Sequence, residues 1–131
     1  MCFDKPRLPI RKQSEKTEAI STATKHQWYK ENPPAHNGTW TCYLQIAPEC
    51  PVLVTHSTIQ QEHVKPKVHY KELRHVLINI KPACQDCNKL KGSTELEKLA
   101  KSYPRIKAML LQPEWKQWEI EVQKFVQPEL H

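Results

Sequence analysis

Four of the five cysteines fall into two clusters whose spacing suits a metal ion. Residues 84–87 read Cys-Gln-Asp-Cys, and this C-x2-C spacing lets two thiolates converge on one tetrahedral ion from a tight turn. A complete site needs two more ligands, and Cys42 and Cys50 are the other paired candidates. The spacing favours a structural zinc site formed by Cys42, Cys50, Cys84 and Cys87, with independent buried thiols as the alternative interpretation.

A second group of residues, between and after the cysteine clusters, carries the functional groups that phosphodiester hydrolysis needs. A histidine with a pKa of about 6.5 is a suitable base for deprotonating water at neutral pH. Carboxylate and amide oxygens suit Mg²⁺ or Mn²⁺, which neutralises charge on the phosphate and on the leaving oxygen. The group consists of Glu62, His63, Asn79, Asn88 and Lys91.

The order of these residues resembles that of the HNH nuclease family. The family pattern starts with an acidic residue or His, then His, a β-branched residue, any residue and Pro, and continues through a central Asn to C-x2-C-N-x2-K-G. Residues 62–66 read Glu-His-Val-Lys-Pro, and residues 84–92 read Cys-Gln-Asp-Cys-Asn-Lys-Leu-Lys-Gly. The resemblance covers roughly residues 40–92 and implies a ββα-metal fold, in which a hairpin and a helix enclose one catalytic divalent ion.

The resemblance also implies a role for each motif residue. Glu62, where the family more often has Asp or His, and Asn88 would bind the catalytic Mg²⁺ or Mn²⁺. His63 would be the general base, and Asn79 would hold the loop and orient the His63 ring. Adjacent strand residues point to opposite sides, so the backbone must bend for Glu62 and His63 to serve one site. Nucleic acid would be bound by Lys65, Lys67, Lys89 and Lys91, the last of which would face phosphate.

A single site of this kind cleaves one phosphodiester at a time, so the resemblance implies an endonuclease that nicks one DNA strand. The residues themselves do not distinguish DNA from RNA. A non-catalytic zinc module that binds nucleic acid or a protein, within a larger nucleic-acid-processing complex, is the main alternative. Zinc deaminases also combine His, Glu and P-C-x2-C, but Pro82-Ala83-Cys84 has one residue too many and Glu62 directly precedes His63.

The composition agrees with a nucleic-acid partner. The chain has 131 residues and a formal net charge of +6. Residues 61–92 contain seven Lys or Arg and three Asp or Glu, and this concentration of positive charge suits a polyanion. No stretch approaches the roughly 20 apolar residues of a membrane span. We therefore expect a cytoplasmic protein with reduced cysteines and no membrane contact, in which Cys2 is left over from the zinc site.

The sequence also predicts the elements that position these residues. A basic arm and a helix from about residue 14 to 30 precede Asn32-Pro33-Pro34. Alternation over 40–46 and the apolar run 52–55 predict a hairpin, and 77–80 a further strand that Pro82 interrupts. Past Gly92 the pattern is helical, with a capping box at 94–97 and helices that start near Pro104 and Pro113.

We therefore predict an α+β protein with a small ββα-metal core and a zinc knuckle, flanked by helices at both ends. Residues 1–36 are expected to form the arm and first helix, residues 37–93 the nuclease core, and residues 94–131 a helical extension that packs on the core. The extension is nearly neutral, so it is the expected contact for a second copy of the chain or a protein partner.

Overall fold

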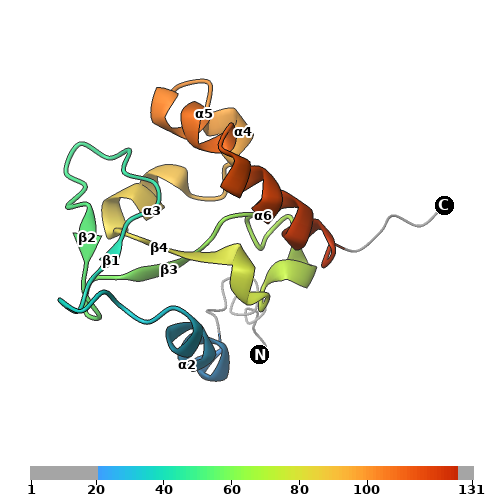
Figure 1. Ribbon diagram of the computed structural model, residues 1–131. Coiled ribbons are helices and arrows are strands. Elements are labelled where there is room, and N and C mark those ends of the chain that lie inside the picture. Colours follow the sequence, from blue (N-terminus) through green and yellow to red (C-terminus); the bar gives the residue numbers. More distant parts are fainter. Residues whose placement is uncertain (1–20, 127–131) are drawn as a thin grey trace, which may run out of the picture.

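The computed structural model describes residues 21–126, so the basic arm and the start of the expected first helix lie outside the described residues. The α+β fold is confirmed. Helix α2 lies on one side of the strand pair β3–β4, and helices α3 to α6 lie on the other side (Figure 1). The helices are α2 (Thr22–Glu31), α3 (Gln85–Lys91), α4 (Leu96–Leu99), α5 (Pro104–Leu110) and α6 (Pro113–Gln123). The strands and 3-10 turns are β1 (Trp40–Thr41), β2 (Leu53–Val54), β3 (Gln60–His63), η2 (Lys71–Leu73), η3 (Leu77–Asn79) and β4 (Ile80–Ala83).

The ββα unit consists of β3, β4 and α3. Strands β3 and β4 are antiparallel, with Gln60 opposite Ala83 and His63 opposite Ile80. Pro82 does not interrupt β4, contrary to the prediction. The Pro82 carbonyl accepts a hydrogen bond from the Tyr43 N–H, so the backbone of Pro82 faces Tyr43 and not β3. The β3–β4 pair therefore loses no hydrogen bond through the N–H that proline lacks.

The predicted first hairpin is present but short. Trp40 pairs with Val54 and Thr41 with Leu53, and the expected strand over 40–46 stops there. The next segment, residues 42–47, turns toward β4 and α3, where its N–H groups donate to the Pro82 carbonyl and to the Cys87 sulfur. Contacts with sulfur and with β4 therefore end the strand, although the side-chain pattern continues beyond it.

Helix α2 packs on the core through Trp28. The Ser21 hydroxyl caps its first turn, and the helix ends at Glu31, as the following prolines predict. Trp28 is fully buried, and its indole N–H donates to the Ile80 carbonyl at 2.9 Å. This bond joins α2 directly to the first residue of β4, the neighbour of His63 across the sheet.

The C-terminal helices begin at Pro104 and Pro113, which confirms the role predicted for these prolines. The capping box at 94–97 is wrong: α4 has Glu95 as its N-cap, without a side-chain cap bond. Thr94 instead continues the turn after α3, where its N–H donates to the Lys91 carbonyl. None of the helices in the described part of the chain is long and apolar enough to cross a membrane.

Gln45 and Val52 are the described non-glycine residues with positive φ, and Val52, directly before β2, is the β-branched one. Its φ of 71° lies in the left-handed region, which β-branched residues avoid because the side chain crowds the backbone. We expect Val52→Gly to raise the free energy of unfolding by about 0.5–1 kcal/mol, because Val52 is 42% exposed and loses little packing. Urea denaturation measures the change.

Val68→Gly is the matched control for this substitution. Val68 is 60% exposed and is not among the described residues with positive φ. This substitution should lower stability, because glycine adds only conformational freedom to the unfolded chain. Equal destabilisation of the two variants would show that Val52 is not strained.

Candidate active site and metal centre

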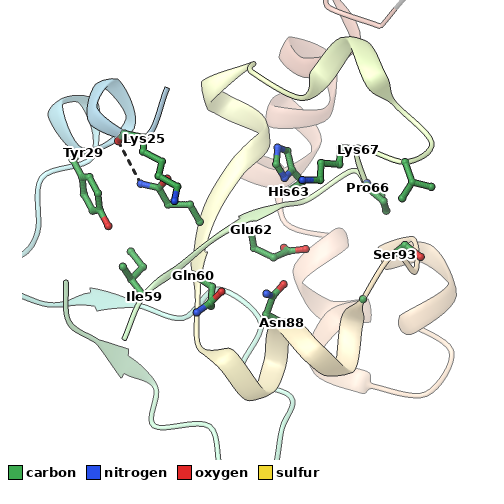
Figure 2. Close-up of a pocket in the computed structure, with 13 residues that line it drawn as sticks. Lys25, Tyr29, Ile59, Gln60, Glu62, His63, Pro66, Lys67, Asn88 and Ser93 are labelled. Carbon is green, nitrogen blue, oxygen red and sulfur yellow. Dashed lines mark hydrogen bonds between the residues drawn. The ribbon is translucent and has the colours of Figure 1, made fainter. Parts of the chain in front are cut away.

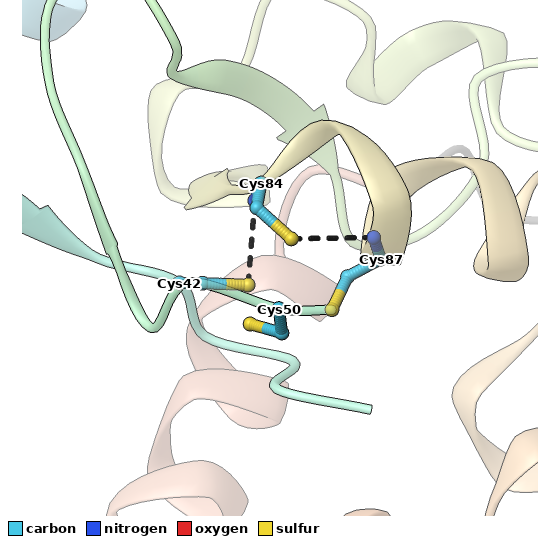
Figure 3. A group of neighbouring side chains, drawn as sticks. All are labelled: Cys42, Cys50, Cys84 and Cys87. Carbon is cyan, nitrogen blue, oxygen red and sulfur yellow. Dashed lines mark hydrogen bonds between the residues drawn. The ribbon is translucent and has the colours of Figure 1, made fainter. Parts of the chain in front are cut away.

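The two cysteine clusters meet in the folded chain. The sulfur atoms of Cys42, Cys50, Cys84 and Cys87 all lie within 4.8 Å of one another (Figure 3). Zinc–sulfur bonds of about 2.3 Å in a tetrahedron place sulfur atoms roughly 3.8 Å apart, so the cluster is close to the size that one zinc ion requires. The structure thus brings together the four residues that sequence spacing selected, and the cluster can hold a structural metal.

Backbone N–H groups point at the sulfur atoms. Cys87 Sγ accepts from Ile46 N at 3.2 Å and from Ala47 N at 3.3 Å, and Cys84 Sγ accepts from Cys87 N at 3.3 Å. Two further bonds of this kind reach Cys42 and Cys50. Such donors stabilise thiolates, the form in which cysteine binds metals.

The thiol pKa values show the balance between burial and these donors. Burial raises the pKa of Cys84 to about 12. At Cys87 burial also opposes ionisation, but the Ala47 and Ile46 N–H groups and the neighbouring thiols outweigh it, so the pKa of Cys87 lies below its ordinary value. Three buried sulfur atoms and the partly buried Cys50 sulfur form a donor set that suits a thiophilic cation.

A cavity of about 530 Å³ contains three of the residues expected to act in catalysis (Figure 2). Glu62 and His63 reach it from the end of β3, and Asn88 reaches it from α3. The Glu62 and His63 side chains leave the strand in different directions, as adjacent strand residues do, yet both line this cavity. Lys25 and Tyr29 line its α2 side, and the Gln61 amide donates to the Lys25 carbonyl at 3.5 Å.

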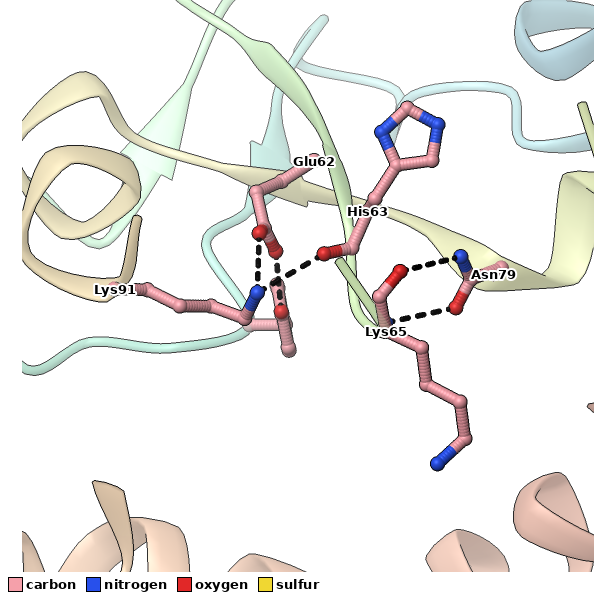
Figure 4. A network of polar contacts seen from close by, with 6 residues as sticks. Glu62, His63, Lys65, Asn79 and Lys91 are labelled. Atoms are coloured by element: carbon pink, nitrogen blue, oxygen red, sulfur yellow. Dashed lines mark hydrogen bonds and ion pairs between the residues drawn. The ribbon is translucent and has the colours of Figure 1, made fainter. Parts of the chain in front are cut away.

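Glu62 is buried, and two side chains bind its carboxylate (Figure 4). Lys91 Nζ lies 2.8 Å from Oε2, and the Tyr43 hydroxyl donates to Oε1. Burial is the largest influence and raises the pKa of Glu62, while Lys91 and Tyr43 act in the opposite direction. The carboxylate is thus held in a fixed orientation by one ammonium and one phenol.

Lys91 does not take the position that the sequence suggested. It was expected to face phosphate, but it is 1% exposed, and its ammonium also donates to the His63 carbonyl at 3.0 Å. A buried ammonium needs an anionic partner and further acceptors, and Glu62 and this carbonyl supply them. Lys91 therefore joins α3 to β3 and directs its charge at Glu62, away from solvent.

The His63 ring is oriented by a backbone carbonyl. Its Nε2 lies 2.8 Å from the Arg74 carbonyl oxygen. A carbonyl can only accept, so Nε2 carries the proton, and in the neutral ring Nδ1 has a free lone pair. Burial, followed by the charges of Lys67, Lys91 and His75, lowers the pKa of His63, although the Arg74 bond acts against this. This lowered pKa favours the neutral ring, in which Nδ1 is the basic nitrogen.

Asn79 holds the loop after β3. Its Oδ1 accepts from Lys65 N at 2.9 Å, and its Nδ2 donates to the Lys65 carbonyl at 3.1 Å. Its own carbonyl accepts from Val64 N at 2.8 Å, and the side chain is fully buried. The contact with the loop agrees with the expected role, whereas the ring of His63 is held by Arg74 and not by Asn79.

The other lysines expected to bind nucleic acid differ in their surroundings. Lys67 lines the cavity, and burial lowers its pKa. Lys89 is exposed on α3. Lys65 forms an ion pair with Glu119 of α6 at 3.4 Å and lies over the rings of Tyr70 and Trp118. Lys67 therefore lies at the cavity and Lys89 at the surface, whereas Lys65 contacts helix α6.

Sequence reasoning missed Tyr43. It precedes Glu62 by 19 residues, and no spacing rule links the two. Its ring stacks on Trp115 of α6, with centroids 6.3 Å apart and planes 8° from parallel. The same helix donates a hydrogen bond from Trp118 to the Ile78 carbonyl, directly before Asn79. Helix α6 therefore supports both the Glu62 carboxylate and the Asn79 loop.

Comparison with known proteins agrees with this geometry. Residues 49–94 match the family model described as HNH endonuclease. No curated protein and no solved structure matches the chain significantly. The matched segment includes Glu62, His63, Asn79, Asn88 and Lys91, but it starts after Cys42 and Tyr43. The ββα unit thus lies within the segment that matches the HNH family model, whereas residues before this segment complete the cysteine cluster, contact Glu62 and line the α2 side of the cavity.

We expect the purified chain to contain one zinc ion and Cys84→Ser to lose it. Loss of the metal should lower the free energy of unfolding by about 3 kcal/mol or more, because metal binding and folding are coupled. Metal analysis and urea denaturation measure the two effects. Cys2→Ser is the matched control, because Cys42, Cys50, Cys84 and Cys87 already supply the four ligands of a tetrahedral site, so the zinc content should be unchanged. A Cys84→Ser variant of unchanged zinc content and stability would contradict a structural metal at this cluster.

Proposed function

We propose that the HNH segment is a metal-dependent DNA endonuclease that nicks one strand per active site, with His63 as the general base. One observation supports this above all: Glu62, His63 and Asn88 line one cavity, and the Arg74 carbonyl leaves His63 Nδ1 free to accept a proton. A neutral imidazole beside a carboxylate and an amide is the combination that hydrolysis of a phosphodiester requires.

Glu62 and Asn88 would hold the catalytic Mg²⁺ or Mn²⁺. Both offer oxygen ligands to the same cavity, which suits these hard cations. Tyr43 and Lys91 each bind one carboxylate oxygen of Glu62, and each oxygen has a second lone pair. When bound, the ion neutralises charge on the scissile phosphate and on the leaving oxygen.

The protein groups would supply the base and its orientation. His63 Nδ1 takes a proton from the attacking water, while Nε2 keeps its bond to the Arg74 carbonyl as the ring becomes positive. Asn79 holds the loop that follows His63 through two bonds to the Lys65 backbone. Tyr43 and Lys91 favour the charged form of Glu62 against the cost of burial.

A polyanionic strand would approach the cavity past lysine side chains. Lys25 and Lys67 line it, and Lys89 is exposed on the same helix as Asn88. Lysines at such positions neutralise phosphates without reading sequence, so we expect weak dependence on sequence and strong dependence on salt. DNA is the proposed substrate because the family match is to endonucleases.

His63→Ala should reduce nicking of supercoiled plasmid by about 100-fold or more in Mg²⁺ or Mn²⁺, because it removes the base. Gel electrophoresis of the relaxed product measures the rate, and metal analysis should find the zinc content unchanged. His69→Ala, which alters an exposed histidine that does not line the cavity, should nick like the unaltered chain. If the unaltered chain and His63→Ala are equally inert with every divalent ion, the segment is a non-catalytic zinc module.

Tyr43→Phe should raise the Mg²⁺ concentration for half-maximal nicking by about tenfold, because Glu62 loses the hydroxyl that orients it. Titration of the nicking rate with Mg²⁺ measures this shift, which a general loss of stability would not produce. Tyr103→Phe, a half-buried tyrosine that does not line the cavity, is the control. An unchanged Mg²⁺ requirement in Tyr43→Phe would show that Tyr43 has no influence on metal binding.

A further inference from the structure

A second cavity, of about 580 Å³, has walls that are largely aromatic. Helix α2 contributes His26, Tyr29 and Lys30, the segment before β1 contributes Pro34 and Gly38, and Trp40 and His56 complete the lining. Tyr29 also lines the cavity that contains Glu62, His63 and Asn88. The two cavities are therefore neighbours that share one aromatic side chain.

The rings of this second cavity are held in place by one another. Tyr29 stacks on His56, with centroids 4.8 Å apart and planes at 25°, and it contacts Trp40 at 5.5 Å. The Trp40 indole N–H donates to the Asn32 carbonyl at 2.7 Å, and Trp40 is 9% exposed. The Trp40 side of the cavity is thus anchored in the core, while His56 is exposed.

Helix α2 also places a lysine side chain at each of the two cavities. Lys30 lines the aromatic cavity, and Lys25 lines the cavity of His63. The acidic residue of this helix, Glu31, accepts a hydrogen bond from Gln27 on an exposed part of the helix and lines neither cavity. A positively charged rim beside stacked aromatic rings is suited to a ligand that has both a phosphate and a flat π-face.

We propose that the aromatic cavity binds an unpaired nucleobase of the strand whose phosphate occupies the cavity of His63, an inference that rests on the proposed function. Every nucleobase has a flat face that can stack on aromatic rings, and such stacking tolerates any sequence. A base that is paired inside a duplex does not expose this face, so the cavity selects single-stranded, mismatched or flipped-out positions. The shared Tyr29 is the physical link between base binding and the site of cleavage.

The test compares two single strands of equal length in the full-length His63→Ala chain without added divalent ion. One strand has its natural bases, and the other is built from abasic residues with the same number of phosphates. Fluorescence anisotropy gives both affinities. The strand with bases should bind about tenfold more tightly, which corresponds to stacking of at least one base.

Substitutions then locate the effect. Tyr29→Leu and His56→Ala should each weaken binding of the natural strand by about tenfold and leave the abasic strand unaffected. Tyr29→Phe retains the ring, so this variant should bind the natural strand as tightly as the chain with Tyr29. The comparison separates a loss of stacking from a loss of folding. His36→Ala is the matched control, because His36 is an exposed histidine that lines neither cavity.

Equal affinity for the two strands, or an equal loss for both strands in Tyr29→Leu, would overturn the proposal. A change in oligomeric state on sedimentation, without a change in affinity for DNA, would also overturn it and assign the cavity to a second copy of the chain. Plasmid nicking by the unaltered chain shows whether the base-binding inference or the proposed endonuclease function has failed. Nicking without base-dependent binding contradicts this inference alone, whereas base-dependent binding without nicking supports the base site and contradicts the endonuclease.

Discussion

The arrangement of the cavity that Glu62, His63 and Asn88 line depends on a buried ion pair between Lys91 and Glu62. Removing both charges from water is costly, and the cost is offset only where geometry is good and the remaining donors find acceptors. The Lys91 ammonium finds a second acceptor in the His63 carbonyl, and the Glu62 carboxylate finds a second donor in the Tyr43 hydroxyl. The pair fixes α3 against the end of β3, and this places Asn88 at the cavity that Glu62 and His63 line.

Support for this pair comes from outside the ββα unit. Trp115 stacks on Tyr43, and Glu119 binds Lys65 in the loop that Asn79 holds. On the other side of the sheet, Trp28 joins α2 to the first residue of β4. The four cysteines tie the segment from 42 to 50 to the start of α3, so a bound metal would stabilise the same helix that contains Lys91. The flanking helices and the cysteine cluster thus stabilise the position of a short motif.

The sequence predicted the helix starts at the prolines and the meeting of the cysteine clusters, but it did not predict the contacts between distant segments that surround Glu62 and His63. Prolines fix helix starts locally, and the C-x2-C turn forms within α3 itself, so both were predictable. The burial of Lys91 and the contact of Tyr43 with Glu62 arise from packing between distant segments, which spacing does not encode. The Arg74 carbonyl is a backbone group, so no side-chain pattern reveals that it orients His63.

The bond to the Arg74 carbonyl requires the His63 proton on Nε2 and leaves the lone pair of the neutral ring on Nδ1. Long-range proton–nitrogen correlation spectra of the uniformly nitrogen-labelled chain report the tautomer of each histidine directly. The His63 signals are assigned by their loss in His63→Gln, and spectra are recorded above the ordinary histidine pKa. We predict a protonated Nε2 and an unprotonated Nδ1 for His63. A proton on Nδ1 would leave no lone pair there to accept a proton from water and would rule out His63 Nδ1 as the base.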